Sequence, residues 1–386
     1  MNISNLNEKI DLSKISVIIP VYNAQAVIER CVESILAQDY SGELEIVLIN
    51  DGSTDDSGNV CQKLALSNPD KIVCVTQPNG GVSSARNHGV KVASGDLICF
   101  VDADDILAKD MLSRLEGILR ENNADVSECD FFTFDDVKTL HIAEGKSVLA
   151  EGKSVLAEEK SAVADDEKCA FGAKNHTSEE TAGCTFKGIN ECNTKTVQNT
   201  AYIEHLIYGR DTHVWGKLYK KELFNQMCFP EDMTIGEDIL FLLKLPENAK
   251  LAIADYKGYG YYVNPEGAME KPFTPSYMDE LYCWERVLGW MEDNTSKRLI
   301  YDELLDRTAS YTLIAAMLVI AKLSKTDISR IDADKMSCYE ETCKNSLASI
   351  LKKYPAAKKE LDYKYRIKIA LYRCIPGLYK RLIRNF

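Results

Sequence analysis

The stretch Ile15-Ser-Val-Ile-Ile-Pro-Val-Tyr22 decides the fold, because it is a β-branched apolar run with the length of one buried strand. Beyond it the apolar residues change to a helical spacing, with one face formed by Ile28, Cys31, Val32, Ile35 and Leu36. The alternation continues with a strand at 45–50, a strand at 72–76, a helix at 80–93 and a strand at 96–101. Strands that alternate with helices form a mostly parallel sheet with helices on both faces, so the predicted class is α/β.

The turn after the second strand leads into another predicted helix. It reads Asp51-Gly-Ser-Thr-Asp55, and hydroxyl side chains are favoured at helix N-termini because they accept hydrogen bonds from unpaired backbone N–H groups. We therefore expect Ser53 or Thr54 to cap this helix.

The composition indicates a folded, acidic protein. The chain has 386 residues, of which 45% are hydrophobic, enough for a sizeable core. Its net charge of −13 argues against a nucleic-acid partner, because phosphate contacts need clustered Lys and Arg. Residues 351–386 differ, since eleven Lys and Arg there face two acidic residues and give this tail a charge of +9. A basic tail on an acidic body predicts an anionic surface as its partner.

Cysteine usage and hydropathy predict the compartment. The thirteen cysteines show no paired metal-ligand spacing, which fits a reducing environment. Residues 1–14 lack the apolar segment of a secretory signal. The longest apolar run, residues 311–321, has eleven residues, fewer than the roughly 20 of a membrane-spanning helix. We therefore expect a cytoplasmic protein that is soluble or bound at a membrane surface.

Changes of pattern divide the chain into four parts, at 1–136, 137–200, 201–273 and 274–386. In the second part, Ala-Glu-Gly-Lys-Ser-Val-Leu at 143–149 recurs at 150–156 and approximately at 157–163. Glycine in two of the copies disfavours a coiled coil, so we predict a low-complexity insertion that is largely flexible. The fourth part is helical in pattern.

Polar residues gather where the predicted strands end. Asp51 follows the second strand, Asn79 follows the third, and Ile98-Cys-Phe-Val-Asp-Ala-Asp-Asp105 ends in three carboxylates. The carboxyl ends of parallel strands meet at one edge of a sheet, where ligands bind. Asp102 and Asp104 share a face of an extended chain and suit Mg²⁺ or Mn²⁺, which would relieve their repulsion and assist a departing phosphate. The alternative is a helix N-terminus, where the dipole favours acids, Asp105 above all.

Several segments together resemble the family 2 inverting glycosyltransferases of bacterial capsule and exopolysaccharide synthesis. They are SVIIPVYNAQAVIERCVESILAQDY, EIVLINDGSTDDS, NGGVSSARNHGVKVASGD, ICFVDADD, VWGKLYKKELF and GEDILF. The resemblance is close over about residues 14–130 and resumes at the last two segments. It implies the GT-A fold, with 1–136 as the nucleotide-sugar half, 201–273 as the acceptor half and Mn²⁺ or Mg²⁺ as cofactor.

The same resemblance implies roles for residues at the strand ends. Pro20, Val21 and Tyr22 would line the nucleobase and ribose, and Asp51 would accept a hydrogen bond from the uracil imide. The remaining donor contacts would come from Asn79, Arg86, Asp102 and Ala103, with Asp104 binding the metal. Many members carry an acidic residue just after the Tyr-Asn pair, whereas Ala24-Gln25 follows here, which puts that contact in doubt. For Arg86 the alternative is an ordinary cation on a helix surface.

Inverting displacement needs a carboxylate that accepts the proton of the attacking hydroxyl. Gly236-Glu237-Asp238 precedes an apolar run, and the resemblance places the base there, with Asp238 favoured and Glu237 as the fallback. Simple capping of a helix by acids is the alternative. Lys217 would contact a phosphate or the acceptor, and Trp215 would either stack on a sugar ring or lie in the core.

The basic tail mixes aromatic and aliphatic residues with cations, as helices at a membrane interface do. Such contact at the inner membrane face would bring the enzyme close to a lipid-linked acceptor. The alternative is a solvated basic helix folded onto the acidic body.

These observations predict an inverting glycosyltransferase that moves a hexose or N-acetylhexosamine from a nucleotide-diphosphate sugar, with UDP favoured by the resemblance. The acceptor would be a cell-surface polysaccharide or a lipid-linked saccharide. One rival is a sugar-1-phosphate nucleotidyltransferase, which carries a Gly-rich basic loop after the first strand, where PVYNAQA stands here. A second rival is a non-catalytic GT-A-fold binding protein, against which the acids Asp102, Asp104 and Asp238 speak.

Overall fold

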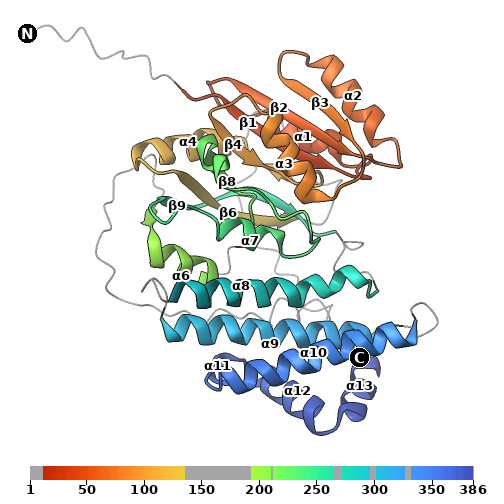
Figure 1. Ribbon diagram of the computed structural model, residues 1–386. Coiled ribbons are helices and arrows are strands. Elements are labelled where there is room, and N and C mark those ends of the chain that lie inside the picture. Colours follow the sequence, from red (N-terminus) through yellow and green to blue (C-terminus); the bar gives the residue numbers. More distant parts are fainter. Residues whose placement is uncertain are drawn as a thin grey trace, which may run out of the picture.

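The computed structural model describes residues 12–134, 193–209, 212–264, 272–295, 301–326 and 332–385. A twisted sheet with flanking helices occupies one end, and a stack of helices occupies the other (Figure 1). The three heptapeptide copies lie outside the described residues, so their predicted flexibility stays a prediction.

The first part of the chain forms the predicted parallel sheet. Its elements are β1 (Ile15–Val21), α1 (Ile28–Leu36), β2 (Leu44–Asp51), α2 (Ser57–Ser67), β3 (Ile72–Gln77), α3 (Val82–Val92) and β4 (Leu97–Phe100). The four strands are parallel and lie in the order β3-β2-β1-β4. The side chains of Ile15, Val17, Ile18 and Ile19 are all fully buried, as expected for a strand covered on both faces. The α/β prediction is confirmed.

Strand register brings the polar strand ends together at one edge. Val21 of β1 pairs with Asn50 of β2, and Asp51 at the end of β2 pairs with Gln77 of β3. On the other side Ile18 of β1 pairs with Phe100, the last residue of β4. The segments that follow these strands therefore leave the sheet at the same edge, where the predicted site residues lie.

The predicted cap of α2 is wrong. The helix begins at Ser57, and the side chain of the preceding residue, Asp56, makes no capping hydrogen bond. Ser53 and Thr54 instead contact the loop after β1: the Asn23 N–H donates to Ser53 Oγ (3.1 Å), and the Thr54 N–H donates to Asn23 Oδ1 (2.8 Å). Asn23, about thirty residues upstream, thus holds this turn in place, and the helix begins only after it.

The sheet continues into a second, mixed half. It contains β5 (Ile106–Leu107), β6 (Val126–Phe134), β7 (Thr194–Val197), β8 (Lys217–Lys220) and β9 (Leu251–Tyr262). β8 joins the halves, because it pairs antiparallel with both β4 and β6. The accompanying helices are α4 (Met111–Glu121), α6 (Asn199–Gly209), η1 (Lys221–Asn225) and α7 (Glu237–Leu242). The described residues together form a nine-stranded sheet.

The insertion ends earlier than the predicted boundary at residue 200. Thr194–Val197 forms β7, which pairs antiparallel with β9, and α6 begins at Asn199. Residues 193–200 therefore belong to the folded body, since their backbone groups complete an edge of the main sheet.

The last part is helical, as predicted. It consists of η3 (Pro275–Met278), α8 (Asp279–Thr295), α9 (Asp302–Lys325), α10 (Ala333–Lys353), α11 (Ala357–Glu360), α12 (Tyr363–Cys374) and α13 (Pro376–Asn385). Helix α9 has the length and apolar composition of a membrane span, but 78% of its apolar window is buried inside the protein. Helices α8, α10 and α11 pack against it, which makes α9 the core of the helical layer (Figure 1).

The helical layer shares a core with the sheet. One hydrophobic cluster runs from Phe100 of β4 through Phe241 of α7 to Leu281 of α8 and Met317 of α9. The Tyr311 hydroxyl of α9 also donates to the carbonyl of Ile207 in α6 (2.9 Å). The helical layer therefore packs as one body with the second, mixed half of the sheet and its helices rather than as a separate module.

Candidate active site

The loop after β4 separates its three carboxylates into two roles. Asp105 is buried, and its carboxylate accepts hydrogen bonds from the Tyr259 hydroxyl (2.6 Å) and the Tyr262 N–H (2.7 Å). The Tyr259 hydroxyl in turn accepts the Asp102 N–H (3.2 Å). Burial, followed by the charge of Asp102, raises the pKa of Asp105 to about 8. Asp105 therefore anchors the loop, while Asp102 and Asp104 remain partly exposed.

The alternative interpretation of this loop as a helix N-terminus is wrong. The residues that follow Asp105 form the short strand β5, and α4 does not begin until Met111. The pairing of β5 with β9 explains the difference, because Ile106 and Leu107 are held extended opposite Gly260 and Tyr259.

Arg86 of α3 joins the two halves of the domain at this loop. One guanidinium nitrogen contacts Asp102 Oδ1 at 3.0 Å, and another contacts Asp238 Oδ1 at 2.7 Å and Glu237 Oε1 at 3.1 Å. The guanidinium also lies over the Phe229 ring, 5.3 Å from its centre. Arg86 is only 3% exposed, so the interpretation as a surface cation is wrong. We name Arg86, Asp102, Glu237 and Asp238 the arginine cluster.

The acids of α7 reach the cluster because of the turn that precedes them. Gly236 has φ +82°, and a Cβ atom there would lie 2.3 Å from the Cys283 sulfur of α8, so only glycine fits. Burial and the neighbouring Asp238 carboxylate raise the pKa of Glu237 to about 7, against the opposing effect of Arg86. Two carboxylates of unlike environment thus sit side by side at the N-terminus of α7.

Asp51 organises the loop between β3 and α3. Its two carboxylate oxygens accept the backbone N–H groups of Gly80 (2.9 Å) and Gly81 (2.8 Å) and the amide of Gln77 (2.7 Å). Asn79 lies between Gln77 and Gly80 in this loop, and its side chain is exposed at the edge of the sheet. The loop lies so close to β2 that a Cβ on Gly52 would approach the Asn79 nitrogen to 2.7 Å.

The residues at the end of β1 and just after it differ in how far their side chains are exposed. The Tyr22 ring is 51% exposed and Pro20 is half-buried, whereas the Val21 side chain is fully buried in the core. Val21 can therefore reach a ligand only through its backbone. The side-chain oxygen of Gln25, in the loop that follows, accepts the Asp56 N–H (2.7 Å).

Trp215 and Lys217 are buried beneath the site rather than exposed in it. The Trp215 ring stacks on His213 (4.2 Å between centres) and Tyr259 (4.4 Å), which agrees with the core alternative. Lys217 is 1% exposed, and its ammonium contacts Glu128 Oε2 at 3.3 Å and donates to the His213 carbonyl at 2.8 Å. The same Glu128 contacts His205 Nε2 at 2.9 Å. We name Lys217, Glu128 and His205 the lysine cluster.

The donor atoms suit a divalent cation held jointly with a ligand. Burial and Asp102 raise the pKa of Asp104, which indicates two carboxylates close enough to repel each other. Within the described ranges no group of three or more His, Cys, Asp or Glu side chains is arranged to hold a metal. The protein therefore offers hard oxygen donors from Asp102 and Asp104, and a diphosphate and water would complete the coordination.

Comparison with known proteins identifies the domain. The model of the family "Glycosyl transferase family 2" matches residues 16–147. The chain is 31% identical to the glycosyltransferase EpsJ of Bacillus subtilis over 272 residues, 69% of this chain and 65% of EpsJ. It is 26% identical to the minor teichoic acid biosynthesis protein GgaB of the same species over 265 residues, 68% of this chain and 24% of GgaB.

A solved structure has the same fold. The crystal structure of S. aureus TarS 1–349 in complex with UDP-GlcNAc superposes with a TM-score of 0.53 at 18% identity, covering 96% of this chain and 90% of that one. This likeness confirms the GT-A fold with its helical region. The chain spans 65% of EpsJ and 24% of GgaB, and its residues 16–147 belong to glycosyl transferase family 2.

Proposed function

We propose that this protein is an inverting glycosyltransferase that moves a hexose or N-acetylhexosamine from a UDP-sugar to a saccharide acceptor. One observation carries the proposal. The Arg86 guanidinium holds Asp102, beside the expected donor site, and Asp238, from the other half, at 3.0 and 2.7 Å. This arrangement supports a mechanism in which a sugar donor bound at the strand ends lies close to Asp238, the proposed general base of α7.

The relatives support the substrate classes. EpsJ is named a glycosyltransferase, GgaB is named for teichoic acid biosynthesis, and TarS was solved with UDP-GlcNAc. These names support a nucleotide-sugar donor and an acceptor that is part of a cell-surface polysaccharide, free or lipid-linked. A cytoplasmic location at the inner membrane face would give access to such an acceptor.

The donor site that we propose uses the strand edge. The exposed Tyr22 ring and Pro20 would cover the nucleobase, and Asn79 would contact it from the loop that Asp51 organises. Asp51 accepts hydrogen bonds from that loop, so we propose that its uracil contact replaces or shares one of these bonds. Asp102 and Ala103 would contact the sugar and ribose, and Asp104 would hold the metal.

In the proposed reaction Asp238 accepts the proton of the acceptor hydroxyl while that oxygen attacks the anomeric carbon. The bond between the anomeric carbon and the diphosphate oxygen breaks on the opposite face, which inverts the configuration. Arg86 orients Asp238 and supplies its counter-charge. Mn²⁺ or Mg²⁺ at Asp104 would supply a Lewis acid for the departing UDP. Trp215 and Lys217 would support the site from below rather than contact substrate.

A thermal-shift screen of nucleotide sugars with Mn²⁺, followed by transfer and hydrolysis assays, tests the proposal. A ligand at 100 times its Kd stabilises a protein by about 2.7 kcal/mol, so a UDP-sugar should give a clear shift. Asp104→Ala should lose the Mn²⁺-dependent shift and turnover, whereas Asp70→Ala, at an exposed acid before β3, should retain both.

Two results would contradict this proposal. Consumption of UTP and a sugar 1-phosphate would identify a nucleotidyltransferase, although the PVYNAQA loop after β1 lacks the basic Gly-rich sequence of that class. Binding of donors with no turnover in the presence of any acceptor would identify a binding protein.

A further inference from the structure

The last two described helices carry an unusual outer face. Their exposed large apolar side chains, which we name the outer stripe, are Tyr363, Ile367, Ile375, Leu378 and Leu382. Ile367 of α12 is 59% exposed, and Ile375, between α12 and α13, is 53% exposed, although both helices pack on the body. Isolated exposed apolar residues are ordinary, whereas a row of them marks an interaction surface.

Helical spacing places the stripe on one side. Along α12 the exposed Tyr363 and Ile367 are four residues apart, and in α13 Leu378 and Leu382 repeat this spacing. The opposite face of each helix is buried, through Tyr365, Ile369 and Tyr372 in α12 and Tyr379 in α13.

Polar contacts fix this orientation. Lys380 contacts Glu340 of α10 at 2.6 Å, and the Arg384 guanidinium donates to the Ser324 carbonyl of α9 at 2.7 Å. The Tyr372 hydroxyl donates to Glu340 at 2.8 Å. Since these contacts hold the inner faces of α12 and α13, the stripe faces outward without any unfolding of the tail.

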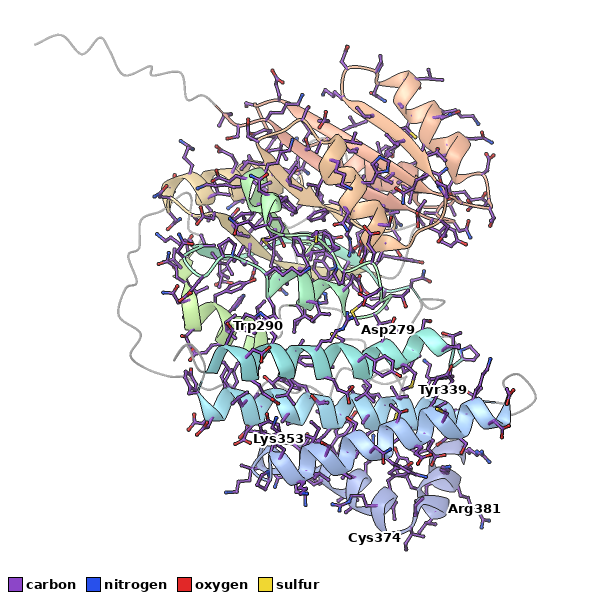
Figure 2. All side chains as sticks on the ribbon, in the orientation of Figure 1. Asp279, Trp290, Tyr339, Lys353, Cys374 and Arg381 are labelled. Carbon is purple, nitrogen blue, oxygen red and sulfur yellow. The ribbon has the colours of Figure 1, made fainter. Side chains whose placement is uncertain are left out.

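The charges beside the stripe select its partner. Lys364, Arg373 and Arg381 are exposed on the same two helices, and residues 351–386 carry +9 against −22 on residues 1–350. Cys374 and Arg381 lie at the end of the molecule farthest from the sheet (Figure 2). An anionic surface that meets this end would attract the tail and repel the acidic body.

We propose that α12 and α13 dock on an anionic lipid bilayer, with the outer stripe in the interfacial region and Lys364, Arg373 and Arg381 at the lipid phosphates. Apolar side chains interleaved with cations match this partner, because the headgroup boundary is apolar below and negatively charged above. Docking uses the folded helices, and α9 stays buried in the core. The proposal deepens the proposed function by naming the surface that would bring the enzyme to a lipid-linked acceptor.

Liposome flotation of the full chain tests the proposal. The unaltered protein should float with phosphatidylcholine vesicles that contain phosphatidylglycerol and stay in the dense fraction with phosphatidylcholine alone. One variant carries Ile367→Ser, Leu378→Ser and Leu382→Ser, and another carries Lys364→Gln, Arg373→Gln and Arg381→Gln. Since each surface cation contributes roughly a fivefold step in partitioning, the loss of three should lower the partitioning of the second variant roughly 100-fold.

A matched control lies on α2, at the opposite end of the molecule (Figure 1). Lys63 and Leu66 are exposed there, so Lys63→Gln with Leu66→Ser changes the same kinds of side chain and should float like the unaltered protein. Unchanged circular dichroism melting of each variant shows that its helices still fold, since the buried faces are not altered.

Equal flotation of the unaltered protein and both tail variants would overturn the proposal, as would equal flotation with neutral and anionic vesicles. A dimer in light scattering that the serine variant converts to a monomer, with no flotation, would also overturn it and assign the stripe to self-association. Flotation needs neither donor nor acceptor. Its outcome is therefore independent of the transferase assay, in which the tail variants should turn over soluble substrates like the unaltered protein.

Discussion

The arginine cluster joins α3, α7 and the loop after β4, whereas the lysine cluster joins β6, β8 and α6, and the two clusters differ in their balance of charge. In the arginine cluster one cation faces the three carboxylates of Asp102, Glu237 and Asp238. In the lysine cluster one carboxylate, Glu128, faces Lys217 and the His205 ring. Where carboxylates outnumber the cation, one of them can still bind a proton or a metal. Where the charges are matched, each group only neutralises its partner. We therefore propose a chemical role for the arginine cluster and a role in stability for the lysine cluster.

The largest expected effect separates the two clusters by activity. Asp238→Asn should lower kcat of transfer by about 100- to 10,000-fold, because general-base catalysis contributes on that scale, with the protein still folded. Lys217→Met should leave kcat near the unaltered value but lower the free energy of unfolding by about 3–5 kcal/mol, since it removes the ammonium from the buried Glu128. Steady-state kinetics and urea unfolding of both variants measure this split. If Lys217→Met lowers kcat under conditions in which the variant is fully folded, the lysine cluster also takes part in catalysis and the contrast between the clusters is wrong.

The second prediction concerns pH and sharpens the assignment within the arginine cluster. Glu237 has a folded-state pKa of about 7, above its usual value, so the native state favours the protonated form. Its contribution to stability is complete below about pH 4.5 and is lost as the pH rises through 7. Relative to the unaltered protein, Glu237→Gln should therefore gain stability between pH 5 and 7, by at most about 1.4 kcal/mol per pH unit, and then level off.

Urea unfolding of both proteins at several pH values measures this difference, and a difference that shrinks as the pH rises would contradict the assignment. The same variant tests the choice of base. If Glu237→Gln abolishes transfer while Asp238→Asn retains it, the base is Glu237.

The smallest effect is expected from the hydroxyl that holds the loop after β4. Tyr259→Phe removes the donor to Asp105 and the acceptor of the Asp102 N–H, and should cost about 1–3 kcal/mol of unfolding free energy. Because this hydroxyl positions Asp102, kcat should fall more in Tyr259→Phe than in Tyr219→Phe. The latter removes a buried hydroxyl from β8, the strand that contains Lys217, and this hydroxyl donates to the Val214 carbonyl. Equal kcat in the two variants would show that the loop does not depend on Tyr259.

The local pattern of apolar residues was sufficient to predict the parallel half of the sheet and the edge at which its polar residues meet. The strands β1 to β4 are apolar runs separated by helical spacing, and the chain direction alone brings Asp51, Asn79 and Asp102 to one edge. Where a residue's partner lies close in sequence or in the same predicted layer, the prediction agrees with the structure.

The errors occur where the partner is distant. Ser53 and Thr54 contact Asn23 instead of α2. Arg86, for which the sequence predicted only a donor contact or a place on the helix surface, contacts two acids more than 150 residues downstream. Lys217 faces Glu128 because the register of β6 against β8 pairs these two residues. Strand register across a sheet is not encoded in either strand alone, so a lysine with the spacing of a ligand-binding residue became a core ion pair.

The amino-acid sequence by itself determined the α/β alternation, the family, the acidic residues at the strand ends and the +9 charge of the tail, because each depends on residue type and spacing along one segment. Only the tertiary structure decided which charges are buried together and which faces stay open. It placed Arg86 among three acids, removed Lys217 and Trp215 from the surface, and turned the outer stripe of α12 and α13 away from α9 and α10. Burial and long-range pairing set the energy of a charge or an apolar side chain, and both exist only after distant segments have packed.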